Sequence, residues 1–365
     1  MNNEKAIIGF IGAGGIARSH ALSLNSLNYF YNDSPAIKLE AVSSATKESR
    51  SSFARRFGFH KSPDMEEFVS DRNINTVFIL GPNKVHFEHL KASLGMTGVN
   101  HIYLEKPVCS NIEEERAISE MIITRPDVKI QIGFQYLYTS VVREALVMWR
   151  SGKFGKPVHF DLKYYHSDYL KKDYRDKRKS RLTAAPDGGA MADLGSHIIS
   201  LLIAFLGERI TITSSLQSGH FEDVVTDSDL FSLISIYDND SRAVGTLSAS
   251  RISSGTGDFI SFELYAEKGA LRFSSFTPDY FEFYLEESGT WNRQFTGSNY
   301  KPFSSFPSGH VPPGWLRSMI HAHYVFLTDS ENEAIIPDIN HGLAVQKFVR
   351  QTAEHLKEFR DVINK

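Results

Sequence analysis

Asp193 and His197 are the two residues whose types and spacing most clearly suggest chemistry. They lie four positions apart, in a segment of helical apolar periodicity that begins with Gly188 and Gly189. In a helix such a pair lies on one face, one turn apart. A carboxylate beside an imidazole can orient the ring while the ring takes up or releases a proton. The pair is therefore a candidate acid–base device, although an exposed or half-buried polar pair has the same spacing.

A glycine-rich turn near the N-terminus suggests a nucleotide. Residues 6–11 form an apolar run typical of a strand buried on both faces, and Gly12-Ala13-Gly14-Gly15-Ile16-Ala17 and a helical pattern follow. This order matches the dinucleotide-binding fingerprint. Gly12 permits the tight turn, and Gly14 lets the backbone approach the pyrophosphate at the helix N-terminus. We expect the cofactor to contact Gly12, Gly14, Gly15 and Ile16.

The end of the second expected strand bears on the choice of cofactor. An acidic residue there would hold the ribose 2′-hydroxyl of NAD. Ser44 stands at that position, and Lys47 and Arg50 follow it. Without an acidic residue at that position, and with two cations close by, the loop can accept the 2′-phosphate of NADP, so the pattern favours NADP, with Ser44 and Lys47 as contacts. The same cations could simply face solvent, which leaves NAD open.

Strands and helices alternate through the first third of the chain, as a parallel sheet requires. Further strands are expected at 37–42, 76–80, 102–104 and 128–134. Ligands of such sheets bind beyond the carboxyl ends of the strands. Pro82 and Asn83 follow one of these strands, and Glu105 and Lys106 follow the next.

The pattern changes in the second part of the chain. Apolar and polar residues alternate at 158–165, 229–237, 243–250, 260–266 and 280–285. This period of two predicts an open antiparallel sheet with one covered face. The other face carries many Tyr and Phe side chains, which predicts a homodimer or homotetramer through this sheet. We expect domains at 1–135 and 136–365.

Composition excludes several classes of partner. The 40 basic and 43 acidic residues give a net charge of −3, so no overall field favours nucleic acid or an anionic membrane. No apolar run is long enough to span a bilayer, and the first strand begins too early to leave room for a secretory leader. The only cysteine, Cys109, fits a reducing cytoplasm. No Cys/His spacing indicates a metal, and His321 and His323 are interpreted as structural.

Four motifs occur in one order along the chain. They are the fingerprint, Pro82-Asn83 with His86, Glu105-Lys106-Pro107, and Gly188-Gly189 followed by Asp193, Gly195 and His197. Together they resemble the glucose–fructose oxidoreductase / inositol dehydrogenase family, Gfo/Idh/MocA, over nearly the whole chain. The resemblance implies an α/β protein: an N-terminal Rossmann domain, then an α/β domain with a large, open, mostly antiparallel sheet. It also implies an active site in the cleft between the domains.

The resemblance implies NAD(P)-dependent oxidation of a secondary alcohol of a sugar, sugar derivative or cyclitol, or reduction of the matching ketone. By position, Lys106, Asp193 and His197 match the family's catalytic residues. His197 would take the hydroxyl proton, Asp193 would hold the imidazole, and Lys106 would stabilise the developing alkoxide. The implied cofactor contacts also include Pro82, Asn83, His86, Glu105 and Lys106.

Two departures from the family pattern concern the substrate. Ser200 stands where many members have an acidic residue, and residues 133–138 lack the usual Asn and Arg. Tyr138, His166 and Arg181 are candidate substrate contacts. The basic run at 171–181 could be a lid or an anion clamp, or simply a solvated loop.

Two other functions are compatible with the motifs. Some relatives use a tightly held NAD to cleave glycosides through a transient oxidation. A non-catalytic regulatory protein would be expected to lack Lys106 or His197, and both are present.

Overall fold

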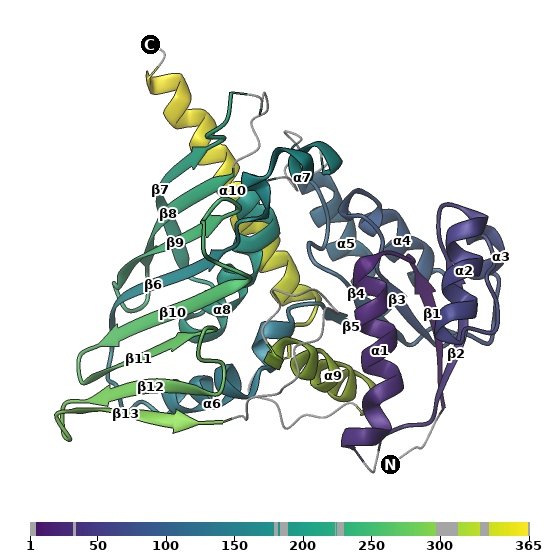
Figure 1. Cartoon of the computed structure of the whole chain (residues 1–365), viewed down its shortest axis with the longest axis horizontal. Coiled ribbons are helices and arrows are strands. Elements are labelled where there is room, and N and C mark those ends of the chain that lie inside the picture. Colours follow the sequence, from purple (N-terminus) through teal and green to yellow (C-terminus); the bar gives the residue numbers. More distant parts are fainter. Residues whose placement is uncertain are drawn as a thin grey trace. The chain divides into compact units, whose positions relative to one another are not determined.

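The computed structural model describes residues 5–31, 34–178, 182, 189–222, 224, 230–296, 313–328 and 336–363 (Figure 1). Contacts divide the chain into two units. The first consists of Met1–Tyr138 and Leu316–Leu343, and the second of Thr139–Trp315 and Ala344–Lys365.

The first unit is built on a parallel five-stranded sheet of order β2-β1-β3-β4-β5. Its strands are β1 (Ala6–Ile11), β2 (Ile37–Ser43), β3 (Thr76–Ile79), β4 (His101–Leu104) and β5 (Lys129–Ile132). Between them lie α1 (Gly15–Phe30), α2 (Lys47–Phe57), α3 (Met65–Val69), α4 (His86–Leu94) and α5 (Ile112–Thr124), with short 3-10 turns η1 (Asn83–Val85) and η2 (Gln135–Tyr138). The predicted Rossmann-type alternation of strands and helices is confirmed.

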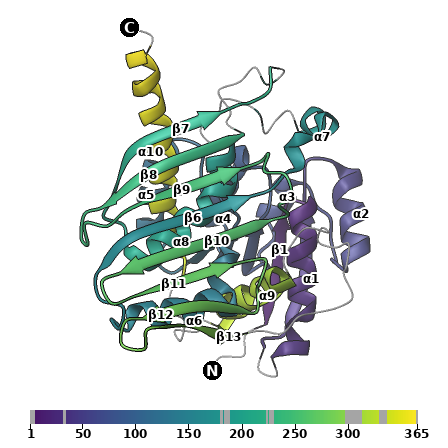
Figure 2. The ribbon, with the colours of Figure 1, turned by 60° about the vertical axis from the view of Figure 1, so that its left-hand side comes forward.

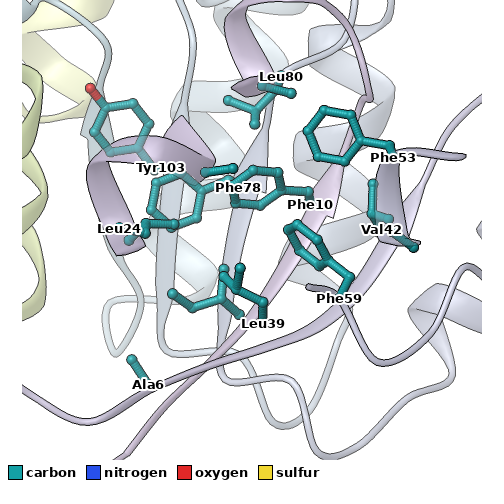
Figure 3. Packing of buried hydrophobic residues seen from close by; sticks show 14 of the residues in the cluster. Ala6, Phe10, Leu24, Leu39, Val42, Phe53, Phe59, Phe78, Leu80 and Tyr103 are labelled. Carbon is teal, nitrogen blue, oxygen red and sulfur yellow. The ribbon is translucent and has the colours of Figure 1, made fainter. Parts of the chain in front are cut away.

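Aromatic rings fill the core of this unit on one side of the sheet (Figure 3). The rings of Phe10 and Phe78, from neighbouring strands, lie 5.3 Å apart, and Phe78 stacks on Tyr103 at 5.1 Å. The helix α9 (Pro313–Thr328) adds Phe326, which meets Phe78 edge-on at 5.9 Å. Full burial of each such ring stabilises the fold by roughly 2–3 kcal/mol, which anchors this late segment to the first unit.

The second unit contains an eight-stranded sheet of order β13-β12-β11-β10-β6-β9-β8-β7 (Figure 2). Its strands are β6 (Pro157–Tyr165), β7 (Ile210–Ser218), β8 (Phe231–Asp238), β9 (Val244–Ser250), β10 (Phe259–Ala266), β11 (Gly269–Ser274), β12 (Tyr280–Leu285) and β13 (Thr290–Phe295). All neighbours are antiparallel except β6 and β9. The predicted large, mostly antiparallel sheet is confirmed.

Helices cover one face of this sheet. They include α6 (Ser140–Arg150), which contacts β11 and β12, and α8 (Ser196–Leu206), which contacts β6. The remaining elements are η3 (Asp168–Leu170), α7 (Lys172–Lys177), the π-helical turn η5 (Met191–Gly195) and α10 (Ile339–Ile363). The alternation follows from this cover: Phe160, Leu162 and Tyr164 of β6 are buried, while the residues between them are only half-buried.

The other face of the sheet carries a row of charged side chains. Arg272 on β11 and Arg293 on β13 both bond to the carboxylate of Glu282 on β12, at 2.7 and 3.0 Å. The two guanidinium groups also lie over the rings of Trp291 and Tyr280. This face combines charge with exposed aromatic surface.

Among the described residues, no helix has the length and hydropathy needed to cross a membrane. The same residues contain no group of three or more His, Cys, Asp or Glu side chains arranged to hold a metal ion.

Buried histidines should make the fold sensitive to acid. Burial lowers the pKa of His341 from 6.5 to about 4, so the folded state excludes a proton that the unfolded chain binds below pH 6.5. The contribution of His341 to the free energy of unfolding is therefore fully present above pH 6.5 and is lost as the pH drops toward 4. Between pH 7 and pH 5, His341→Gln should lose about 2 kcal/mol less unfolding free energy than the wild type. Urea titrations at both pH values measure this; equal losses in the two proteins would contradict it.

Candidate active site

The turn between β1 and α1 has the geometry that an anionic cofactor needs. Gly12 has φ +125°, and a Cβ there would lie 2.6 Å from the backbone of Leu80. Its N–H donates to the carbonyl of Ser43 at 2.8 Å, so the turn abuts the ends of β2 and β3. A Cβ added at Gly14 or Gly15 would meet no atom within 4 Å. These glycines therefore leave open space that the protein itself does not fill.

The beginning of α1 also suits the pyrophosphate of a dinucleotide. No side chain caps this helix, and its first turn contains no acidic residue. The backbone N–H groups of a first helical turn have no partner within the helix, and the helix dipole favours negative charge there. The residues present fit the phosphates of NAD or NADP, with Ile16 in the first turn.

The loop after β2 follows directly on Ser43, the last residue of the strand. Ser44 is half-buried, and its hydroxyl donates to the carbonyl of Thr46 at 3.3 Å. Arg50 donates to the carbonyls of Ser62 and Ser44, at 3.1 and 3.4 Å, so its guanidinium helps to shape the loop. Lys47, the first residue of α2, is exposed.

His86 connects the ends of two neighbouring strands. Its Nε2 lies 2.9 Å from the carbonyl of Gly81, after β3, and its Nδ1 lies 2.6 Å from the carbonyl of Pro107, after β4. Burial lowers the pKa of His86, and the two carbonyl contacts oppose this shift. Of the other predicted contacts after β3, Pro82 is exposed and Asn83 is half-buried.

The motif Glu105-Lys106-Pro107 directly follows β4. The backbone N–H of Glu105 donates to the carbonyl of Ile79 on β3 at 3.0 Å. Its buried carboxylate lies 2.8 Å from Nε2 of His20, on α1. Lys106 is half-buried between Glu105 and Pro107. The predicted cofactor residues of the first unit thus gather at the carboxyl ends of β1, β2, β3 and β4.

The second unit holds Asp193 and His197. The segment enters its helix through Gly189, whose φ of +86° favours glycine. Asp193 lies in the π-helical turn η5, and His197 lies in the first turn of α8 and is 5% exposed. The predicted helix is present, with a wider turn than the α-helical spacing implies.

A buried arginine faces Asp193. Arg251, directly after β9, donates from Nη2 to Oδ2 of Asp193 at 3.0 Å. Arg251 is 1% exposed, and its guanidinium lies over the ring of Tyr169 at 4.8 Å. A guanidinium so deeply buried needs an anionic partner, and a carboxylate facing it is stabilised in the ionised form. Asp193 is therefore suited to act as a fixed anion.

Comparison with known proteins identifies the family to which the chain belongs. Residues 7–134 match the model of an oxidoreductase family with an NAD-binding Rossmann fold, and residues 142–272 match the GFO/IDH/MocA C-terminal domain. The chain belongs to the Gfo/Idh/MocA family. It is therefore an oxidoreductase with an NAD-binding domain, as the motifs predict.

Several individual proteins are similar to this Gfo/Idh/MocA chain. Levoglucosan dehydrogenase of Pseudarthrobacter phenanthrenivorans is 24% identical over 93% of both chains. Glucose-6-phosphate 3-dehydrogenase of Bacillus subtilis is 28% identical over 63% of this chain and 62% of its own. A solved structure of levoglucosan dehydrogenase in complex with NADH superposes with a TM-score of 0.83 at 21% identity, over 97% of this chain and 98% of that one. The last likeness shows the shared fold.

The other predicted substrate contacts are distributed over both units. Tyr138 ends η2 in the first unit and is buried, with its ring near that of His321. His166 follows β6 in the second unit, where it is half-buried and stacks on Tyr169. Arg181 lies outside the described residues. Ser200, at the position of a family acid, is buried in α8.

Two cations of the basic run have partners within the loop, whereas Lys171, Lys177 and Arg178 are exposed. Arg175 is buried, donates to the carbonyls of Tyr169 and Leu170, and lies over the ring of Phe221 at 3.9 Å. Lys172 pairs with Asp176 one turn later, at 2.9 Å. These two side chains support the loop itself.

Two residues missed by the sequence analysis contribute to the site: Arg251 and His20. Arg251 follows a strand of alternating pattern, and His20 lies on the apolar stripe of α1. A charged or polar residue at a position expected to be buried is the one signal that could have singled them out.

The open turn generates a direct test of cofactor binding. Gly14→Ala should raise the dissociation constant for NADH about tenfold or more, because the methyl group would occupy the space of the pyrophosphate. The thermal midpoint without cofactor should stay within about 2 °C of wild type, since the new Cβ meets no protein atom and the backbone of Gly14 is extended. NADH fluorescence titration and a thermal melt measure both quantities. Gly12→Ala is the matched control and should lower the thermal midpoint itself.

Proposed function

We propose that this Gfo/Idh/MocA protein transfers hydride between a nicotinamide cofactor and a secondary alcohol or ketone of a sugar, sugar derivative or cyclitol. The observation that carries the proposal is Asp193, held by the buried Arg251 one turn before His197. The dinucleotide-binding turn of the first unit indicates a nicotinamide cofactor, and hydride transfer to or from an alcohol requires an acid–base pair of this kind. The names of the levoglucosan and glucose-6-phosphate relatives, both dehydrogenases, support a carbohydrate substrate.

The bound nicotinamide would supply the hydride acceptor. Hydride leaves a carbinol carbon only if its hydroxyl also loses a proton, and His197 is the proposed base. Asp193 orients the imidazole and stabilises its protonated form, while Arg251 keeps the carboxylate in place. Lys106 stabilises the developing alkoxide with its positive charge, an effect that grows as water is excluded.

We propose that the cofactor is NAD(P), with NADP preferred. The loop after β2 has Ser44 in place of the acidic residue that would repel a 2′-phosphate, and Lys47 is exposed beside it. Arg50 already donates to two carbonyls, so Lys47 is the proposed contact. Pro82, Asn83, His86 and Glu105 would complete the cofactor site, directly or by shaping the strand ends.

The substrate is proposed to be a sugar, sugar derivative or polyol, with or without a phosphate group. Arg175 and Lys172 have partners within their own loop, whereas Lys171, Lys177 and Arg178 are exposed, so the basic run is compatible with either kind of substrate. Tyr138, His166 and Arg181 remain proposed substrate contacts. The single cysteine, Cys109, is buried, and a chain with one cysteine supports the proposed cytoplasmic location.

Turnover of a carbohydrate panel tests the proposal. The wild type should reduce NADP, and NAD less efficiently, with levoglucosan, glucose, glucose 6-phosphate or myo-inositol, followed as absorbance of the reduced cofactor. His197→Asn should lower kcat about 100- to 10,000-fold and leave the dissociation constant for NADH nearly unchanged, because it removes the base alone. Lys106→Ala should lower kcat similarly, and Glu208→Ala, at an exposed position just beyond α8, serves as the control.

Full activity in His197→Asn would remove the proposed base. Cleavage of a glycoside without release of reduced cofactor would instead indicate the glycosidase chemistry of some relatives. A higher kcat/KM with NAD than with NADP would overturn the proposed preference.

Self-association through the open sheet face is a second proposal. The sheet face that carries Arg272 and Glu282 also carries every second residue of β13, namely Trp291, Arg293 and Phe295. Phe295 is 64% exposed. Light scattering should therefore give the mass of a dimer or tetramer for the wild type. Phe295→Glu should lower this mass, whereas Asn292→Glu, which projects from the opposite side of the same strand, should not. A monomeric wild type would contradict the proposal.

A further inference from the structure

A buried chain of three titratable side chains lies in the first unit and ends at Glu105, one of the proposed cofactor residues. Oε1 of Glu105 lies 2.8 Å from Nε2 of His20, and Nδ1 of His20 lies 2.7 Å from Nε2 of His323. The three residues come from the end of β4, from α1 and from α9. His323 is separated from His20 by 303 positions in the sequence.

Both imidazoles are completely buried. The ring of His20 stacks on that of His323 at 4.8 Å and meets the rings of Tyr103 and Phe78 edge-on at 5.1 and 5.6 Å. Substrate cannot reach either histidine in this packing. Polar groups in an aromatic core destabilise the fold unless they are hydrogen-bonded, so the geometry of this chain is strongly constrained.

The positions of the protons follow from the same constraint. Burial holds the pKa of His323 well below its usual value, so this ring is neutral. Its Nδ1 has no partner among the described residues. An unpaired buried acceptor is tolerated better than an unpaired N–H, so the proton lies on Nε2 of His323. His323 then donates to His20, and His20 donates to Glu105.

The chain ends beside Lys106. The carboxyl group of Glu105 lies against Gly133, where an added Cβ would come within 2.9 Å of it. The backbone N–H of Glu105 is bonded to Ile79, and the carbonyl of Pro107 is bonded to His86. Lys106 therefore has a fixed residue on each side, and one of the two is fixed by the histidine chain.

We propose that His20 and His323 are positioning residues that hold Glu105, and through its backbone Lys106, in the place that the reaction requires. This inference rests on the proposed function of Lys106. The hydrogen bonds are directional, so they set the orientation of the carboxylate in a way that apolar packing of equal volume would not. The link also ties the cofactor helix α1 to the strand end that carries the lysine.

Two substitutions of His323 separate positioning from packing. His323→Phe keeps a ring against Phe78 and Tyr103 but removes the donor to His20. His323→Gln places an amide N–H near the position of Nε2 and restores that donor. His323→Phe should lower kcat about 10- to 100-fold, as a small misplacement of a catalytic group does, with the dissociation constant for NADH within about threefold. His323→Gln should recover most of the loss.

Hydrogen exchange supplies a readout that needs no turnover. Backbone amides at 104–108 should exchange about tenfold faster in His323→Phe than in wild type, and near the wild-type rate in His323→Gln, since opening of this segment depends on the bond. Amides of α9 should exchange alike in both variants. If the wild type oxidises no carbohydrate, the proposed function fails and exchange alone decides the inference. Equal kcat and exchange in the Phe and Gln variants, or a wild-type kcat in His323→Phe, would overturn it.

Discussion

The need of buried charged and polar groups for partners determines where both candidate catalytic segments lie. Arg251 is 1% exposed and faces Asp193 at 3.0 Å, and the carboxylate of Glu105 faces His20 at 2.8 Å. Leaving either buried group without its partner would cost several kcal/mol, so the backbone that carries it cannot shift freely. One pair thus fixes a wide helical turn, and the other fixes the end of a strand. The precision expected of a catalytic group comes from these contacts, because a loop alone would not supply it.

Local patterns are sufficient to predict the elements and the cofactor turn. The apolar run before Gly12 predicts β1, and the clash of an added Cβ with Leu80 shows why glycine is needed there. Alternating residues predict the large sheet because helices cover only one of its faces. Strand order is not local information, so the single parallel pair within that sheet, β6 with β9, could not be predicted from the alternation.

Side-chain pairings over long separations could not be predicted for the same reason. Arg251 lies 58 positions from Asp193, and His323 lies 303 positions from His20. His321 and His323 are two positions apart, which predicts only that they point in different directions from their helix. The structure agrees: His321 is hydrogen-bonded to Tyr31, and His323 is hydrogen-bonded to His20. Both side chains are thus part of the packing, as interpreted, but the sequence does not reveal that His323 is linked through His20 to Glu105. The π-helical turn is equally hidden, because four-residue spacing fits both helix types.

The chain is only 24% identical to levoglucosan dehydrogenase over 93% of its length. Such low identity is compatible with the same type of chemistry, because many contacts at the proposed cofactor site are made by main-chain atoms. Gly12 bonds to the carbonyl of Ser43, and His86 contacts the carbonyls of Gly81 and Pro107. Side chains at the accepting positions can change without loss of these contacts. A sugar, by contrast, is distinguished by side-chain donors and acceptors at defined positions. The departures from the family pattern, Ser200 and residues 133–138, are changes of that kind, so the motifs predict hydride chemistry and leave the choice of sugar open.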